Sequence, residues 1–286
     1  MQTLVKSIRR QLHLSQTELA AQLNVTFATV NRWENGHAIP KRQAQEKLCA
    51  LCRAGSVPVF ELTLDKIAAI AAGIPVEDGR ILLFHTSRAG IEGEIAPISR
   101  AQCDFGSGFY LYTEIEDALK LLCGRAQSRL YIASIDPSRL AAVELSDGTD
   151  WAMQVALHRG YLEGMRGEPL YERSQDRLKG CDLVIGSTVN DCMFYVLDSF
   201  FLGRVTDTAL VSSLSALQPG AQYAAITQRA CDAVRLEAEV ELSYLERQFI
   251  EERACQSCRG GVALADQICK KYRREGLYFD ELLAQR

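Results

Sequence analysis

The first 36 residues constrain the fold most, because they predict two short helices joined by a tight turn. Ser15 and Glu18, three positions apart, form a capping box that begins the first helix. An Asn-Val pair then turns the chain, Thr26 caps the second helix, and Asn35-Gly36 ends it. The two helices are expected over residues 16–23 and 27–34. Such a pair is the helix-turn-helix arrangement, whose second helix enters the major groove of DNA.

The amino-acid sequence of this segment resembles that of the DNA-binding domain of the Cro and phage-repressor class. The similarity lies in Leu14-Ser15-Gln16-Thr17-Glu18-Leu19-Ala20 and in Val30-Asn31-Arg32-Trp33-Glu34-Asn35-Gly36. The expected interior positions are Ala20, Val25, Val30 and Trp33. The candidates for DNA contact are Gln16, near a phosphate, and Thr26, Phe27, Thr29, Asn31 and Arg32, at the bases. For each single candidate, the alternative is a solvated helix face.

Formal charge is unevenly distributed along the chain. Residues 1–55 carry eight Lys or Arg and three Asp or Glu, a net charge of +5, whereas the whole chain has −4. The remaining residues therefore carry −9. A basic start on an acidic remainder suggests that only the first domain contacts a polyanion. Together with the helix-turn-helix motif, this charge predicts that the first domain binds duplex DNA as part of a homodimer. The alternative is an accidental skew of solvated surface charge.

Glycine and proline residues, and the ends of the helical patterns, indicate the domain boundaries. Helical residues through about residue 53 are expected to complete a five-helix bundle, and a linker over residues 54–58 follows. The predicted division is a DNA-binding domain over residues 1–55, a linker and helix over 56–78, a second domain over 79–240 and a helical extension over 241–286. The helix within 60–72 is expected to pack against the second domain.

Two stretches of the second domain combine strand formers with polar or glycine residues. Residues 80–87 read as a short buried strand whose polar end delivers His85, Thr86 and Ser87. Downstream, Asp104-Phe105-Gly106-Ser107-Gly108-Phe109-Tyr110-Leu111-Tyr112-Thr113 joins a glycine turn to aromatic strand residues. Glycine lets a ligand approach the backbone closely, and a tyrosine ring can stack on a flat group. Taken alone, the second stretch is also consistent with a β-bulge that leads into a half-buried strand.

Together, the two stretches resemble the first two signature elements of the histidine-tyrosine-glutamate branch of ADP-ribosyltransferases, the branch of diphtheria toxin and the poly-ADP-ribose polymerases. The similarity covers about residues 80–240. It implies an all-α helix-turn-helix bundle followed by an α+β ADP-ribosyltransferase-like domain with a helical C-terminal tail. The resemblance also implies that NAD is the substrate.

The resemblance assigns roles to particular residues. His85 would hydrogen-bond a ribose hydroxyl of NAD, the backbone around Thr86 would hold the nicotinamide amide, and Tyr110 would stack on the nicotinamide ring. The implied NAD-binding residues are His85, Thr86, Ser87, Gly108, Tyr110 and Tyr112. The implied catalytic residues are His85, Tyr110, Gln222 and Asp191.

Gln222 stands where the family has its third signature residue, a glutamate at the start of a late strand. Glutamine keeps a hydrogen bond to ribose but lacks the charge that stabilises an oxocarbenium-like transition state. We therefore expect transfer of a single ADP-ribose rather than of a polymer. Asp191 is the nearest alternative carboxylate, although a helix cap is the other interpretation of it.

Periodicity predicts the remaining elements of the second domain. Strands are expected over 130–135, 182–186 and 222–227, and helices over 115–123, 151–159, 193–202, 206–217, 239–253 and 263–283. His158, within one of these helices, is expected to be structural.

Two functions of different classes remain open. In one, the chain is a DNA-binding mono-ADP-ribosyltransferase that modifies nucleic acid or protein, and similarity to a bacterial domain linked to toxin–antitoxin modules implies a toxin or phage-defence role with an antitoxin as partner. In the other, the catalytic fold is inactive and the chain is an NAD-responsive transcriptional regulator. Transfer of label from NAD, or binding without turnover, distinguishes the two.

Composition excludes several other classes. Ten cysteines in 286 residues are too sparse for a disulfide scaffold. Two Cys-x-x-Cys pairs, Cys49/Cys52 and Cys255/Cys258, lack a nearby histidine, so we expect no metal. No apolar run is long enough to span a bilayer, and the polar start is not typical of a signal peptide. We therefore expect a cytoplasmic protein without a membrane partner.

Overall fold

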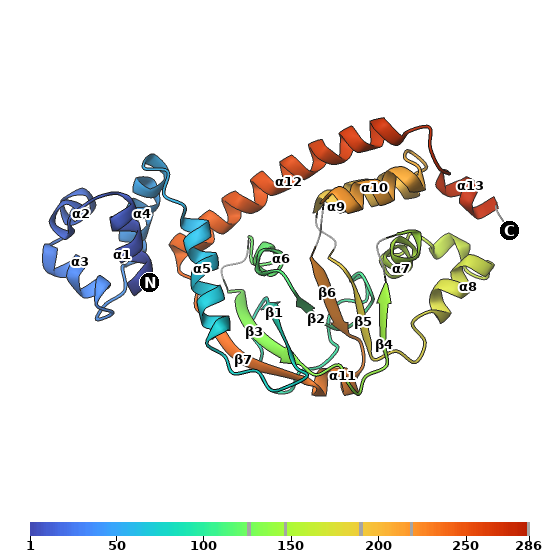
Figure 1. Ribbon diagram of the computed structural model, residues 1–286, viewed down its shortest axis with the longest axis horizontal. Helices are drawn as coiled ribbons and strands as arrows, with labels where there is room; N and C mark the ends of the chain where they lie inside the picture. Colours follow the sequence, from blue (N-terminus) through green and yellow to red (C-terminus); the bar gives the residue numbers. More distant parts are fainter. Residues whose placement is uncertain (125–126, 146–147, 189–190, 218–219, 285–286) are drawn as a thin grey trace.

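A helical head lies at one end of the molecule, and one long helix runs from it across a mixed α/β body (Figure 1). We call residues 1–54 the head and residues 81–240 the body. The computed structural model describes residues 1–124, 127–145, 148–188, 191–217 and 220–284, without the side chains of residues 170, 191 and 192. No helix in these ranges is long and apolar enough to cross a membrane.

The head consists of four helices, α1 Gln2–Gln11, α2 Gln16–Leu23, α3 Phe27–Glu34 and α4 Arg42–Ala54. The predicted caps are confirmed: Ser15 Oγ accepts from the Glu18 amide at 3.2 Å, and Thr26 Oγ1 accepts from the Thr29 amide at 3.2 Å. The prediction that five helices are complete by about residue 53 was wrong. Residues 1–54 form four helices, because residues 42–54 form one unbroken helix. A fifth helix, α5 Val59–Ala72, follows the head and contacts α1, α6 and α12.

The body is built on one seven-stranded sheet with the order β4-β5-β6-β2-β1-β3-β7. Its strands are β1 Ile81–Ser87, β2 Phe109–Tyr112, β3 Arg129–Ile135, β4 Ala142–Leu145, β5 Leu183–Ser187, β6 Ala221–Ala225 and β7 Val234–Val240. Among the strands in the described ranges, only β4 and β5 are parallel neighbours. The sequence analysis missed both edge strands, β4 and β7. Most of their side chains are not buried, which leaves little apolar periodicity to read.

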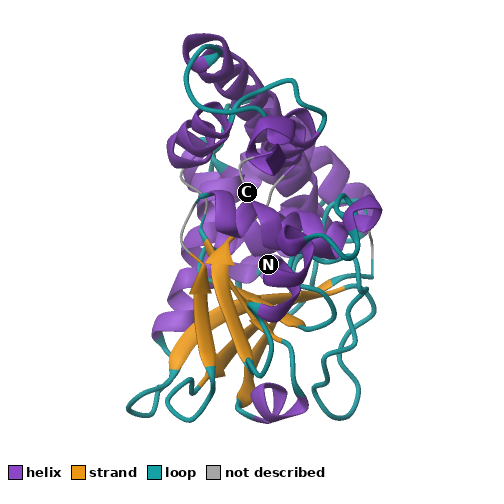
Figure 2. Cartoon of the chain, turned by 90° about the vertical axis from the view of Figure 1, so that its right-hand side faces the viewer, coloured by secondary structure: helices purple, strands orange, loops and turns teal. Residues whose placement is uncertain are grey.

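Helices lie largely to one side of the sheet (Figure 2). The helices that follow β1 are α6 Ile115–Lys120, α7 Thr149–Arg159, the 3₁₀ turn Glu163–Met165, α8 Pro169–Asp176, α9 Asp191–Phe201, α10 Asp207–Leu217, α11 Gln228–Asp232, α12 Tyr244–Tyr272 and α13 Phe279–Ala284, and of these α11 lies at the opposite end of the sheet (Figure 1). The tail was expected as two helices, but α12 is continuous through Gly260. Its predicted start at residue 239 was also wrong, since β7 extends to Val240.

Helix α12 fastens the head to the body. Leu245 is fully buried in the core of the head, and its amide donates to Gln45 Oε1 at 3.0 Å. At the next residue, the buried carboxylate of Glu246 accepts from Lys66 Nζ of α5 at 2.7 Å. On the body side, Arg247 Nη2 donates to the carbonyl of Ser128 at 2.5 Å. The first turns of α12 therefore contact both parts of the molecule.

Candidate functional site

The outer surface of α3 carries most of the predicted DNA contacts. Val30 and Trp33 are buried as predicted, whereas Thr26, Phe27 and Arg32 are exposed. Phe27 is 52% exposed, an unusual state for an aromatic side chain. Ala28, which the sequence analysis did not select, is exposed beside Phe27. The start of α3 therefore presents an apolar side chain to solvent.

Gln16 and Asn31 are partly held inside the head by a buried carboxylate. Gln16 Nε2 donates to Glu34 Oε2 at 2.7 Å, and Asn31 Nδ2 lies 3.4 Å from Gln16 Oε1. Glu34 also accepts from Arg9 Nε at 2.6 Å and from Arg9 Nη2 at 3.0 Å. Burial alone raises the pKa of Glu34, but the hydrogen bonds from Arg9 and Gln16 lower it below its ordinary value. This network joins α1, α2 and α3 and sets the position of α3.

In the body, His85 lies where β1 leaves β2. The two strands pair at Phe84 opposite Tyr112, whereas β1 and β3 pair at seven positions. The His85 ring stacks on Phe109, with 4.0 Å between ring centroids, and its Nδ1 lies 2.7 Å from the carbonyl oxygen of Tyr110. The ring therefore occupies the divergence of β1 and β2.

The Tyr110 contact fixes the chemistry of the His85 ring. A carbonyl oxygen only accepts, so Nδ1 must carry the hydrogen and the neutral ring offers Nε2 as an acceptor. Burial lowers the pKa of His85 to about 4, although the bond to the Tyr110 carbonyl raises it. At neutral pH, His85 is thus a neutral acceptor suited to a hydroxyl donor.

The strand register divides the predicted NAD-binding residues between two faces of the sheet. Residues directly opposite in an antiparallel pair share a face, so Phe84, Tyr112 and Gln222 lie on one side. Successive residues alternate, which places Tyr110 with Tyr112 and places His85 on the other face, beside Phe109. The structure therefore does not bring all of the predicted residues together on one face.

The hydroxyl groups predicted at the site are engaged by the protein itself. Thr86 Oγ1 donates to the Ala118 carbonyl at 2.7 Å, and Ser87 Oγ donates to the Gly90 carbonyl at 2.6 Å. Tyr110 is 8% exposed; its hydroxyl donates to the Gly106 carbonyl at 2.8 Å and accepts from the Phe105 amide at 3.0 Å. Burial raises the pKa of Tyr110. The hydroxyl of Tyr110 thus holds the glycine turn in place.

Gly108 and Tyr112 are similarly enclosed. A Cβ on Gly108 would lie 3.1 Å from the carbonyl oxygen of Ala225, closer than most such contacts, so glycine suits the approach of the turn to β6. Tyr112 is 9% exposed and belongs to the main core of the body. Both residues therefore contribute to packing around the turn.

Gln222 belongs to a buried polar network that the sequence analysis missed. Its side chain is 1% exposed, and Nε2 donates to Asp104 Oδ2 at 2.8 Å and to the Ser187 carbonyl at 3.0 Å. Asp104 Oδ1 accepts from Arg159 Nε at 3.0 Å and from Arg159 Nη2 at 2.5 Å. Both hydrogens of the Gln222 amide are used, so Oε1 is the atom left for another donor. Nothing local in the sequence signals this network, because its three side chains are far apart along the chain.

His158 lies against the glycine turn, on the same side as Asp104. A Cβ on Gly106 would lie 3.0 Å from His158 Nδ1, and His158 Nε2 is buried without a hydrogen-bond partner among the described residues. Burial lowers the pKa of His158, while the charge of Asp104 raises it. Asp191 begins α9, but its side chain is outside the described part of the structure, so its role stays a prediction.

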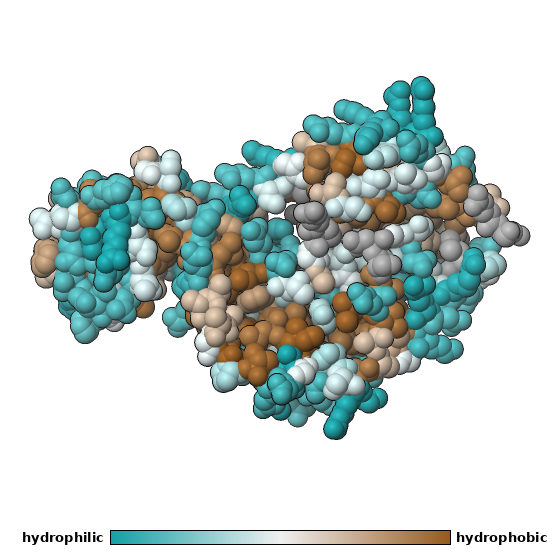
Figure 3. Space-filling view, viewed as in Figure 1, coloured by the Kyte–Doolittle hydropathy of each residue, from teal (hydrophilic) through white to brown (hydrophobic). Residues whose placement is uncertain are grey.

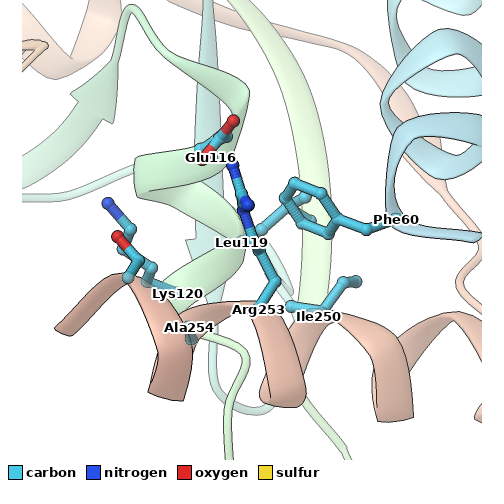
Figure 4. A pocket seen from close by; sticks show the side chains of 8 residues that line it. Phe60, Glu116, Leu119, Lys120, Ile250, Arg253 and Ala254 are labelled. Atoms are coloured by element: carbon cyan, nitrogen blue, oxygen red, sulfur yellow. The ribbon is translucent and has the colours of Figure 1, made fainter. Parts of the chain in front are cut away.

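One pocket and the first Cys-x-x-Cys pair lie apart from the residues predicted to bind NAD. Figure 4 shows a pocket where α5, α6 and α12 meet, around Phe60, Leu119 and Ile250, and its described lining includes no predicted site residue. Cys49 and Cys52 are buried in the head, and burial raises the pKa of Cys52 to about 12. Within the described residues, no group of three or more His, Cys, Asp or Glu is placed to hold a metal ion.

Comparison with known proteins identifies two regions. A family model described as a protein of unknown function, DUF3990, matches residues 81–236. A helix-turn-helix model matches residues 5–62, which include most of α1, all of α2–α4 and the start of α5. No curated protein and no solved structure matches the chain. The helix-turn-helix match indicates that the head binds DNA.

Proposed function

The chain belongs to the DUF3990 family of proteins of unknown function, and on that premise we propose that it is a DNA-binding regulator whose body binds NAD. The helix-turn-helix head supplies the DNA binding. The body supplies the response to the nucleotide, through the site at His85.

The observation that carries the NAD proposal is the state of the His85 ring. Its Nδ1 is engaged by the Tyr110 carbonyl, which leaves Nε2 as a neutral acceptor at the divergence of two strands. A ribose hydroxyl is a donor of the matching kind. Among the residues that the ADP-ribosyltransferase resemblance selects, His85 fits NAD best. Thr86, Ser87 and Tyr110 would contribute backbone and packing, because their hydroxyl groups are already engaged.

A path from this site to the head supports a regulatory role. The end of β1 pairs with the start of β3, where Ser87 is opposite Arg129. The preceding residue, Ser128, accepts from Arg247 of α12 through its carbonyl. Two residues before Arg247, Leu245 is buried in the head. A shift of β3 on nucleotide binding would therefore reach α12 at the point where it holds the head.

Gln222 favours binding without turnover. It carries no charge, is almost fully buried, and uses both amide hydrogens within the protein. A buried neutral amide does not stabilise an oxocarbenium-like ribose as a carboxylate would. One observation favours the second candidate, a mono-ADP-ribosyltransferase: a carboxylate, that of Asp104, lies 2.8 Å from the Gln222 amide, although it is paired with Arg159.

Calorimetry of NAD binding with two substitutions tests the role of His85. His85→Gln retains an acceptor near the position of Nε2, whereas His85→Asn retains only a donor toward the Tyr110 carbonyl. We expect NAD to bind both wild type and His85→Gln. It should bind His85→Asn at least tenfold more weakly, because that variant loses one hydrogen bond at a buried site. Circular dichroism confirms that both variants are folded.

Nicotinamide release, measured in the same samples with added DNA, RNA and protein, separates the two candidates. Binding without release supports the regulator. Release with transfer of ADP-ribose to an acceptor establishes the transferase instead. Absence of NAD binding to wild type contradicts both.

A further inference from the structure

We propose that the head recognises thymine bases through apolar contact between their 5-methyl groups and Phe27, with Ala28 beside it. This inference rests on the DNA binding of the head and is independent of the NAD proposal. It assigns a specificity-determining role to the first residue of α3, whereas the helix-turn-helix match indicates DNA binding alone.

The position and exposure of Phe27 carry the inference. Phe27 is 52% exposed, whereas the other large apolar side chains of α3, Val30 and Trp33, are 0% and 5% exposed. The head surface seen in Figure 3 is predominantly hydrophilic, and of the two exposed large apolar side chains of the head, Phe27 and Ile39, Phe27 is the one that lies on α3. The N-terminal residues of the second helix in a helix-turn-helix contact base edges in the major groove. Phe27 therefore stands where a base edge would lie.

The polar neighbours of Phe27 are less available to DNA. The hydroxyls of Thr26 and Thr29 lie 2.9 Å apart and bond to each other, and Thr26 Oγ1 also caps the helix. Asn31 Oδ1 accepts from Asn35 Nδ2 at 3.1 Å, and its Nδ2 faces Gln16. These side chains therefore already use part of their hydrogen-bonding capacity within the head. Contact through Phe27 and Ala28 uses no hydrogen bond.

Thymine is the base whose chemistry suits this surface. In the major groove it presents a 5-methyl group that the other three bases lack, and apolar side chains recognise it. The exposed Arg32 lies on the same helix and suits a phosphate or a guanine. The net charge of +5 on residues 1–55 supplies the attraction to DNA that is independent of sequence.

The test uses the full chain and a duplex selected from a random pool by binding to it. Each thymine of the selected site is replaced by uracil, which removes the 5-methyl group and keeps the base pair. We expect affinity to fall about fourfold at each contacted thymine, the equivalent of about 0.8 kcal/mol for one buried methyl-sized group. Fluorescence anisotropy at fixed salt measures the affinities.

Substitutions then assign the effect to a residue. Phe27→Ser should bind thymine and uracil duplexes equally, and Phe27→Leu should retain part of the difference. Ile39→Ser, which changes another exposed apolar residue of the head outside α3, should behave as wild type. Phe27 is exposed, so its variants should keep the wild-type melting temperature.

The outcomes distinguish this inference from DNA binding itself. Equal affinity of wild type for thymine and uracil duplexes overturns the role of Phe27 while leaving DNA binding intact. A thymine preference that persists in Phe27→Ser overturns it as well. Failure of the full chain to bind any duplex at low salt contradicts the DNA-binding assignment.

Discussion

The head and the body position their functional side chains in different ways. In the head, the candidates for DNA contact lie within residues 16–32, and local caps at Ser15 and Thr26 place them. In the body, the network of Gln222, Asp104 and Arg159 depends on the pairing of distant strands and on α7. A short motif is therefore sufficient to locate the first site, whereas the second requires the register of the sheet.

Each part nevertheless contains a buried carboxylate that an arginine neutralises. In the head, Arg9 uses two nitrogens on the two oxygens of Glu34, and the pair joins α1 to α3. In the body, Arg159 uses two nitrogens on one oxygen of Asp104, which leaves the other oxygen for Gln222. The head thus uses its pair to hold a helix, and the body uses its pair to orient an amide.

The largest expected effect tests whether the two parts are independent. Leu245→Ala removes a fully buried side chain that α12 contributes to the head, and should lower the free energy of unfolding by about 4 kcal/mol. Leu264→Ala, at an exposed position of the same helix, is the control and should change it by less than 1 kcal/mol. Urea denaturation measures both. A loss below 1 kcal/mol for Leu245→Ala would mean that the head does not depend on α12.

A smaller effect is expected from the buried ion pair of the body. Arg159→Met leaves Asp104 buried without its cation and should cost about 3 kcal/mol of stability. Arg129→Met removes a partner from the exposed pair with Glu239, and should cost less than 1 kcal/mol. Thermal and urea denaturation compare the two variants. Equal losses would show that Asp104 is solvated and does not orient Gln222.

A pH-dependent effect is expected from His85. Its pKa falls to about 4 in the folded protein, so between pH 6.5 and 4 the unfolded chain binds a proton that the folded protein does not. Stability is therefore lost as the pH falls, by about 2 kcal/mol from His85 between pH 7 and 5. His85→Gln should lack this part of the pH dependence when urea denaturation is compared at pH 7 and 5. An identical dependence in the variant would place His85 in solvent.

The smallest effects compare two capping boxes. Ser15→Ala removes an exposed helix cap in the head and should lower the free energy of unfolding by about 1 kcal/mol. Ser243→Ala should cost about 2 kcal/mol, because Ser243 Oγ also donates to the buried carboxylate of Glu246, at 2.6 Å. Denaturation at pH 7 measures the difference. The reverse order would mean that the bond from Ser243 to Glu246 contributes little to stability.

Sequence reasoning succeeded where local signals determine the structure, as in the head, and it failed where distant strands pair, as in the body. Caps and turns act within a few residues, so the bounds of α2 and α3 could be predicted from Ser15, Thr26 and Asn35. The predicted strand around His85 and the late strand carrying Gln222 are also present, as β1 and β6. Both come from runs of strand-forming residues.

The relation between these strands could not be predicted. The face on which His85 lies follows from the pairing of Phe84 with Tyr112, and pairing between distant strands leaves no periodic signal in the sequence. Asp104 lies at the start of the glycine turn that the sequence analysis selected, but its partners, Arg159 and Gln222, are 55 and 118 residues away along the chain. Only the folded sheet shows that a carboxylate adjoins the glutamine.

The most direct test of the regulator proposal is the DNA affinity of the full chain with and without NAD. Fluorescence anisotropy with the selected duplex, at fixed salt and protein concentration, measures the dissociation constant, and chromatography of the same samples measures nicotinamide. We predict that saturating NAD changes the dissociation constant at least fivefold, the lower end of typical coupling between sites, and that no nicotinamide is released. An unchanged dissociation constant despite bound NAD, or steady release of nicotinamide, would contradict the proposal.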